Sequence, residues 1–154
     1  TVTRTIAQSA SYLAKANNAK ILVLTTSGKA AFVVSQFRTG KVLVVAHTEG
    51  VLRKTGMGWG LCPAGVIPRE STAAMLLFSA VNKCLEQGLI GLNDMVVMVY
   101  GWSPGVSGST SSLHCVKASD FLKESKLTQL KEQKLTSVSQ ATVELKIDKS
   151  LPFH

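Results

Sequence analysis

Short apolar runs recur along the chain, and most of them are followed by a segment in which apolar residues have helical spacing. The clearest runs are ILVL at residues 21–24, KVLVVAHT at 41–48 and DMVVMVY at 94–100; shorter ones lie at 60–67 and 111–116. Continuous apolar runs of this length are typical of strands buried on both faces of a parallel sheet. Their alternation with helices predicts an α/β fold, a three-layer α/β/α sandwich with a mostly parallel sheet of about five strands.

Helical segments separate these runs. Residues 3–16 place apolar residues on one stripe, and residues 69–87 show the clearest helical pattern, ended by Gly88. Shorter helices are expected within residues 30–37 and near residues 50–56. The apolar side of the 69–87 helix is expected to consist of Ala74, Leu77, Phe78, Val81 and Leu85.

The character of the sequence changes after residue 116. Residues 1–116 form the α/β domain in this interpretation, and residues 117–154 form a C-terminal extension. Leucines among lysines and glutamates at 121–133 predict a surface helix. Strict alternation of apolar and polar residues at 141–148 predicts an edge strand with one wet face. We expect the extension to pack on the same domain.

The chain is basic, with 17 Lys and Arg against 9 Asp and Glu, a net charge of +8. Such a surplus indicates an anionic partner, either nucleic acid or a phosphate ligand. The basic residues are spaced singly, and aromatic residues do not interleave with them. The pattern therefore favours a phosphate ligand, and we expect no nucleic-acid partner.

The cysteines and the hydropathy pattern indicate a cytoplasmic protein. Three cysteines, Cys62, Cys84 and Cys115, are scattered without a C-x-x-C pair, which fits thiols in a reducing compartment. His47 and His114 lack paired ligand spacing, so no metal site is expected. No apolar run approaches the roughly 18 residues of a membrane span, and no signal-peptide pattern opens the chain.

The segment GWSPG at residues 101–105 fits the G-x-S-x-G pattern of a hydrolase nucleophile. In such hydrolases the serine lies on a sharp turn, the nucleophile elbow, and a helix begins directly after it. Here Pro104 and Gly105 follow Ser103 instead. The histidines available downstream are His114, in an expected strand, and His154. A hydrolase using Ser103 stays the least supported interpretation, and it predicts ester turnover that is lost in Ser103→Ala.

Phosphate binding by a loop that follows a strand is better supported than hydrolysis by Ser103. TTSGK follows the first strand and leads into a helix, whose first N–H groups attract anions. Gly28 permits a tight turn and Lys29 supplies a positive charge, although Val23 occupies the position where a P-loop needs glycine. The alternative is a turn and helix cap without a ligand. The candidate phosphate-binding residues are Thr25, Thr26, Ser27, Gly28 and Lys29.

A second glycine-rich loop follows a later strand. Its glycines allow the backbone to approach a ligand closely, and its hydroxyls supply donors. If the two strands are parallel, both loops meet at the carboxyl edge of the sheet, where ligands of open α/β sheets bind. The candidate residues of this loop are Gly101, Trp102, Ser103, Pro104, Gly105, Ser107, Gly108, Ser109 and Thr110.

Three segments together are similar to a known family. AKILVLTTSGKAAFVVSQFR at 19–38, KVLVVAHT at 41–48 and GLIGLNDMVVMVYGWSPGVSGSTSSLHCV at 88–116 resemble the C-terminal α/β domain of pyruvate kinases. The likeness covers about residues 3–116, and the tail after Val116 has no counterpart. In that family this domain is regulatory, and phosphoryl transfer belongs to a (β/α)₈ barrel, whose roughly 250 residues cannot fit in this chain.

The resemblance implies a sugar-phosphate effector, such as fructose 1,6-bisphosphate, held between residues 25–29 and 101–110. The parent enzyme would transfer phosphate from phosphoenolpyruvate to ADP in glycolysis, using Mg²⁺ and K⁺; the fragment itself would need no cofactor and would be inactive alone. Its partners would be the barrel domain and sister subunits, in a homo-oligomer: a dimer of the fragment or a tetramer of the parent.

Several positions depart from the family pattern. Ser103 and Trp59 stand where arginine is common, and Ala30, Ala31 and Phe32 replace a more polar helix start. The residues that grip a second phosphate in some members have no clear counterpart. The sequence therefore leaves three alternatives for the effector: a sugar bisphosphate, a monophosphate, or no effector at all. The alternative function is a subunit-contact module without effector binding, and the alternative origin is a stand-alone protein rather than an excised domain.

Overall fold

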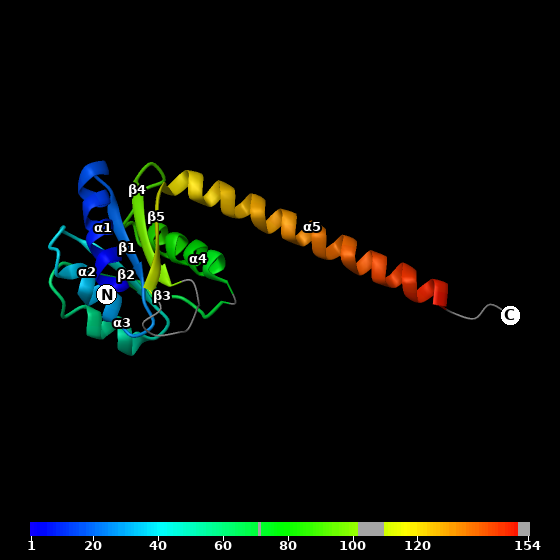
Figure 1. Cartoon of the computed structure of the whole chain (residues 1–154), viewed down its shortest axis with the longest axis horizontal. Helices are drawn as coiled ribbons and strands as arrows, with labels where there is room; N and C mark the ends of the chain where they lie inside the picture. The colour runs from blue at the N-terminus through cyan, green and yellow to red at the C-terminus, as the bar shows by residue number, and fades with distance from the viewer. Residues whose placement is uncertain (71, 102–109, 151–154) are drawn as a thin grey trace. The chain divides into compact units, whose positions relative to one another are not determined.

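The computed structural model describes residues 1–70, 72–101 and 110–150 (Figure 1). Helices and strands alternate through most of the chain, as the sequence predicts. The elements are α1 (Val2–Asn17), β1 (Lys20–Leu24), α2 (Lys29–Ser35), β2 (Val42–Ala46), α3 (Glu49–Thr55), β3 (Leu61–Val66), α4 (Ala73–Glu86), β4 (Met95–Gly101), β5 (Thr110–Lys117) and α5 (Ala118–Ser150).

One five-stranded sheet organises the α/β part, in the order β3-β2-β1-β4-β5. The first four strands in this order run parallel, and β5 joins the edge antiparallel to β4. At the centre, Leu22 of β1 lies opposite Leu43 of β2 and Met98 of β4. Because connections between parallel strands are right-handed, the chain moves outward to β3 and returns through α4 on the other face. The predicted α/β class and mostly parallel sheet are confirmed.

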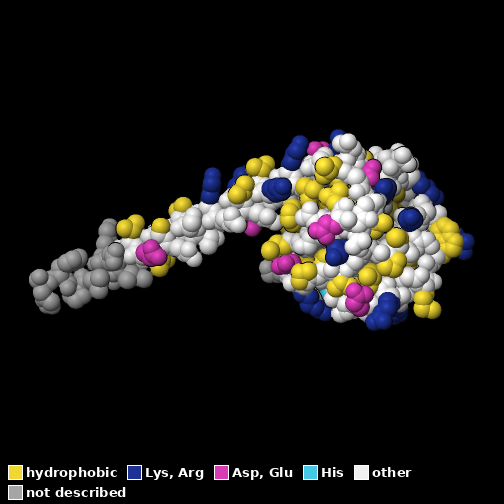
Figure 2. Space-filling view, turned by 180° about the vertical axis from the view of Figure 1, so that it is seen from behind, with side chains coloured by type: hydrophobic (Ala, Val, Ile, Leu, Met, Phe, Trp, Pro, Cys, Tyr) yellow, Lys and Arg dark blue, Asp and Glu magenta, His cyan; other side chains and the backbone are white. Residues whose placement is uncertain are grey.

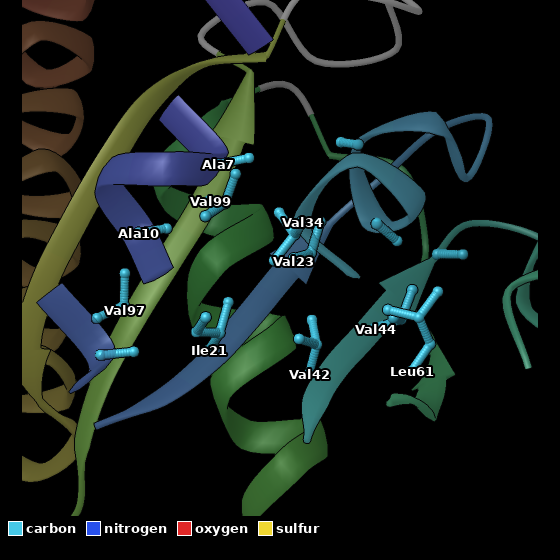
Figure 3. Close-up of a cluster of buried hydrophobic side chains, with 14 of the residues drawn as sticks. Ala7, Ala10, Ile21, Val23, Val34, Val42, Val44, Leu61, Val97 and Val99 are labelled. Atoms are coloured by element: carbon cyan, nitrogen blue, oxygen red, sulfur yellow. The ribbon is translucent and has the colours of Figure 1, made fainter. Parts of the chain in front are cut away.

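Helices cover both faces of the sheet (Figure 3). Ala7 and Ala10 of α1 lie against Val97 and Val99 of β4, and α4 crosses behind the strands. The small alanine side chains let α1 approach the sheet closely, so that the strand valines are fully buried. Continuous burial along β2, from Val42 to Ala46, explains why that run is apolar without alternation.

The starts of three helices are fixed by threonine side chains. The hydroxyl oxygens of Thr1, Thr48 and Thr72 each accept a backbone N–H of the following helix at 3.3 Å. Such caps satisfy amides that have no intrahelical partner. Asn18, with φ 48°, ends α1 in the left-handed conformation.

Helix α4 buries a different side from the one predicted. Of the predicted residues, Leu77 and Val81 are buried, whereas Ala74 is exposed and Phe78 and Leu85 are half-buried. The pattern was ambiguous because apolar residues occur on two adjacent sides of this helix. The buried side consists of Leu76, Leu77, Ala80, Val81 and Cys84.

The C-terminal extension differs from its prediction as well. The chain divides into compact units at Phe121, giving Thr1–Phe121 and Leu122–His154. The predicted edge strand at 141–148 is wrong, because α5 is one continuous helix from Ala118 to Ser150. Thr142 is accommodated there by a 2.9 Å hydrogen bond from its hydroxyl to the Val138 carbonyl. That the extension packs on the α/β unit stays a prediction.

No helix in the described ranges is both long and apolar enough to cross a membrane.

Candidate effector site at the carboxyl edge of the sheet

The parallel pairing of β1 and β4 brings the two predicted loops to one edge of the sheet. Val23 lies opposite Val99, so Thr25 and Gly101 both follow two positions later. Gly101 also pairs with Thr110 across the β4–β5 ladder. Both ends of the 101–110 segment therefore lie at the edge that carries residues 25–29. Between those ends, Trp102, Ser103, Pro104, Gly105, Ser107, Gly108 and Ser109 lie outside the described residues.

The loop after β1 is anchored in the protein interior. Thr25 is buried, and its N–H donates to the Val45 carbonyl of β2 at 3.1 Å. The Thr25 hydroxyl oxygen accepts the Gly28 N–H at 2.9 Å, which closes the turn. Gly28 has φ 91°, a left-handed conformation that side chains disfavour, and a Cβ there would lie 3.2 Å from Thr55 Cγ2. This is why the position carries glycine.

The start of α2 presents donors at this edge. The Ser27 hydroxyl oxygen accepts the Lys29 N–H at 3.4 Å, and Phe32 makes the first bond back to the Gly28 carbonyl, at 3.2 Å. The amides of Ala30 and Ala31 precede that first bond and belong to the group that a helix leaves without intrahelical partners. Both alanine side chains are buried, and the Lys29 side chain is exposed. The arrangement can hold an anion through amides and one ammonium group.

The hydroxyl groups of this loop have a structural role in addition to the predicted contact with an anion. That Thr25 and Ser27 bind an anion stays a prediction. In the structure their oxygens accept hydrogen bonds from the loop itself, so they first of all hold the turn. Each hydroxyl keeps one proton that it can donate. Thr26, half-buried, is the remaining hydroxyl of the loop.

His47 lies at the same edge and was not predicted as part of the site. It follows β2, and its Nδ1 is 3.2 Å from the Ile67 carbonyl oxygen. Since a carbonyl oxygen can only accept, Nδ1 must carry a proton and Nε2 is left for other partners. The position of His47 directly after a strand, like that of Thr25, was the signal that could have found it.

Among the residues that the structure describes, the two groups with perturbed pKa values, Asp94 and Cys84, do not belong to this loop. The Gly91 N–H, 2.7 Å away, and then the Lys20 ammonium lower the pKa of Asp94, which precedes β4 at the opposite edge. Burial, and then the nearby Cys62 thiol, raise the pKa of Cys84 in α4 to about 12. Within the described ranges, no three His, Cys, Asp or Glu side chains are grouped to hold a metal ion.

The histidines considered for a hydrolase do not strengthen that interpretation. His114 lies opposite Met98 within β5, and its ring meets Phe121 edge-on at a centroid distance of 6.2 Å. His114 thus lies inside the sheet, four residues along the chain from Thr110, at which the second loop ends. Ser103 and His154 lie outside the described residues.

Known proteins are similar to this chain in sequence. The family described as "Pyruvate kinase, alpha/beta domain" matches residues 4–116. The pyruvate kinase of Clostridium acetobutylicum is 34% identical over 94 residues, which cover 60% of this chain and 20% of that protein. The pyruvate kinase of Geobacillus stearothermophilus is 31% identical over 124 residues, covering 79% of this chain and 21% of that protein. For the Staphylococcus aureus (strain USA300) pyruvate kinase the identity is 30% over 94 residues.

The matched span includes both loops of the candidate site and nearly the whole sheet. The chain spans only about a fifth of the length of the first two relatives. The resemblance expected from the sequence is thereby confirmed. By the extent of this match, the chain belongs to the pyruvate kinase α/β domain family.

Proposed function

We propose that this chain is a regulatory and oligomerisation domain of a pyruvate kinase, and that it binds a sugar-phosphate effector of the fructose 1,6-bisphosphate type. The effector would lie between residues 25–29 and 101–110. The observation that supports this most is the parallel pairing of β1 with β4, since residues 25–29 and the two ends of the second segment, Gly101 and Thr110, thereby lie at one edge.

The chemistry of the first loop suits a phosphate group. The amides of Ala30 and Ala31 and the Lys29 ammonium are donors, and phosphate oxygens are strong acceptors. The left-handed Gly28 turns the backbone so that these donors follow the strand directly. An effector that also contacts the second loop would bind one arrangement of the domains more tightly than another. It would thereby shift the equilibrium of the enzyme toward the arrangement that it binds better.

The wider activity follows from the relatives, which are named pyruvate kinases. A complete enzyme of this kind would transfer phosphate from phosphoenolpyruvate to ADP in glycolysis, in the cytoplasm. Catalysis, with Mg²⁺ and K⁺, would take place in a separate barrel domain. This domain would contact that barrel and sister subunits, as a dimer of the chain or a tetramer of the enzyme.

Titration calorimetry of the chain with fructose 1,6-bisphosphate tests the effector site. We expect saturable binding, weakened about tenfold in Lys29→Ala, because one charge-assisted contact of this kind is worth about 1.4 kcal/mol. Lys15→Ala, in the last turn of α1, removes an equally exposed charge elsewhere and should bind as the unaltered chain does. The absence of heat with any sugar phosphate would remove the effector proposal.

A second candidate function is a subunit-contact module without an effector. One observation favours it: the amides of Gly28 and Lys29 donate to the hydroxyl oxygens of Thr25 and Ser27, so residues of the loop themselves satisfy these two donors. This function predicts a stable dimer in sedimentation experiments whose mass and stability do not respond to sugar phosphates.

A further inference from the structure

Two connections meet at the amino edge of the sheet, opposite the candidate effector site. One runs from α2 to β2 over residues 36–41, and the other from α3 to β3 over residues 56–60. The Val42 N–H donates to the Gly60 carbonyl at 2.8 Å, and a Cβ on Gly60 would lie 2.6 Å from the Gly40 carbonyl oxygen. The two backbones are therefore packed directly against each other and form a fixed platform.

An arginine and a tryptophan from these two connections stack on one another. The Arg38 guanidinium carbon lies 5.2 Å from the centre of the Trp59 ring, within the range of a cation–π contact. Arg38 is held in a left-handed conformation with φ 50°, uncommon for a residue other than glycine. The contact fixes the tryptophan without covering it, since Trp59 stays 53% exposed and the neighbouring Met57 87% exposed.

The segments that carry this pair contain basic residues only among their charged side chains. The two connections and the last turn of α3 contain no acidic residue. In Figure 2, hydrophobic side chains lie beside Lys and Arg at the right-hand edge of the α/β unit. We call the exposed basic and large apolar residues of the two connections and of the last turn of α3 the basic–aromatic surface; they are Arg38, Lys41, Arg53, Lys54, Met57 and Trp59.

We propose that the basic–aromatic surface docks an acidic segment of a partner protein, which places an apolar side chain against Trp59 and Met57. Tryptophan, methionine and arginine are the residue types enriched at the centres of protein interfaces, and Trp and Arg supply much of their binding energy. Single exposed apolar residues are ordinary. Here, however, an arginine stacks on Trp59, Met57 lies two residues away, and the two connections are packed against each other, so little conformational freedom of the tryptophan is lost on binding.

The charges select the class of partner. The four basic side chains outnumber Glu49, the one acidic residue within residues 36–60, so the surface should attract a segment rich in Asp and Glu and repel a basic one. A second copy of this chain, with its net charge of +8, is a poor match for the surface. Single-stranded nucleic acid normally needs several aromatic side chains along a basic groove, whereas this surface has one tryptophan beside a methionine. An acidic protein segment with an apolar anchor fits best.

Fluorescence anisotropy with a labelled peptide tests the proposal on the full chain. The probe is a short peptide of Asp and Glu around one central Phe. We expect saturable binding that weakens with added salt and falls at least tenfold in Trp59→Ala and in Lys41→Glu/Lys54→Glu. A peptide with Lys in place of the acidic residues, and one with Ser in place of Phe, should each bind at least tenfold more weakly. Lys15→Glu, a charge reversal on α1, is the matched control and should lose less than threefold.

Three results would overturn the proposal. The first is no binding of the acidic peptide, or equal binding of its lysine counterpart. The second is a single-stranded oligonucleotide that binds more tightly than the peptide and depends on Trp59. The third is a dimer in sedimentation that Trp59→Ala dissociates, which would assign the surface to a second copy. Unchanged circular dichroism of each variant ensures that a loss of binding is not a loss of fold.

Discussion

The N–H of Gly28 donates a 2.9 Å hydrogen bond to the hydroxyl oxygen of Thr25. Thr25 is buried and directly follows β1, and Gly28 immediately precedes α2, so this bond joins the end of the strand to the start of the helix. It also explains how a loop of polar residues can start from a buried position, because the buried threonine oxygen has a partner. The candidate phosphate loop is thus held in shape by its own residues.

Thr25→Val is expected to destabilise the protein. Valine keeps the shape of threonine but removes the acceptor, which leaves the Gly28 amide unpaired in a buried site. The cost should be about 1–3 kcal/mol in the free energy of unfolding. Urea denaturation followed by circular dichroism measures it. Thr26→Val leaves the bond in place and serves as the control; an equal loss in both variants would contradict this role of Thr25.

Gly28→Ala and Gly50→Ala should change stability in opposite directions. An alanine at Gly28 would have to adopt φ 91° with its Cβ 3.2 Å from Thr55, which should cost about 1–2 kcal/mol. Gly50 lies within α3, and a Cβ there meets nothing within 4 Å, so alanine should stabilise by up to about 1 kcal/mol. Thermal unfolding of the two variants gives the sign directly, and a tolerated Gly28→Ala would refute the conformational argument.

The parts of the fold that the sequence predicted well are those decided by local pattern. The runs that became β1, β2 and β4 are apolar throughout because both faces of the sheet are covered. Because β1 and β4 were expected to be parallel, the sequence also predicted that residues 25–29 lie at the same edge of the sheet as Gly101 and Thr110. The identity of the loops as a ligand site could not, since it depends on an effector and on residues outside the described ranges.

The errors have a common physical origin in contacts that a sequence pattern does not contain. Alternation at Val143 and Leu145 suits a strand only where a neighbouring strand pairs with it, and these residues instead continue α5 with both side chains exposed. Helix α4 has apolar residues on two sides, and only packing decided that Leu76 and Cys84 face inward. His47 was missed because its contact with Ile67 joins residues that follow two different strands, β2 and β3.

The ion pair between Lys20 and Asp94 should make stability depend on pH in the acidic range. Their charged atoms lie 3.0 Å apart, and the Gly91 amide, more than Lys20, lowers the pKa of Asp94. Because the folded state lowers this pKa, its contribution to stability is present above the ordinary carboxyl range and is lost as pH falls through the lower value. Both side chains are substantially exposed, so the contribution should be small.

Asp94→Asn therefore tests the sign of this effect. Urea unfolding of the variant and the unaltered chain should differ most near neutral pH, and the difference should shrink on acidification below about pH 4. Glu86→Gln, at the end of α4, removes an exposed carboxylate elsewhere and serves as the comparison variant. A difference that grows as the pH falls would show that Asp94 does not have a lowered pKa.

Cys84 is expected to resist alkylation in the folded protein. Burial is the main cause that raises its pKa to about 12, and the side chain is fully buried, so both the reactive thiolate and access are lacking. Treatment with iodoacetamide near pH 8, followed by mass spectrometry of peptides, should label the half-buried Cys62 and Cys115 before Cys84. All three should react in urea. Early labelling of Cys84 would show that α4 opens readily from the sheet.

Removal of most of α5 tests whether the extension contributes to the stability of the α/β unit. A chain ending at residue 126 keeps Phe121, which is buried, and loses a helical segment with exposed leucines and valines. If the two compact units are energetically independent, its free energy of unfolding should stay within about 0.5 kcal/mol of the full chain. Circular dichroism should lose helical signal at the same time.

The matched comparison is Phe121→Ala in the full chain, which empties a buried site and should cost about 3–5 kcal/mol. A large loss on truncation would instead support the prediction from the sequence that residues 117–154 pack on the domain. The two results separate a free-standing helix from a packed one, because only a packed helix would bury its apolar side chains and stabilise the sheet.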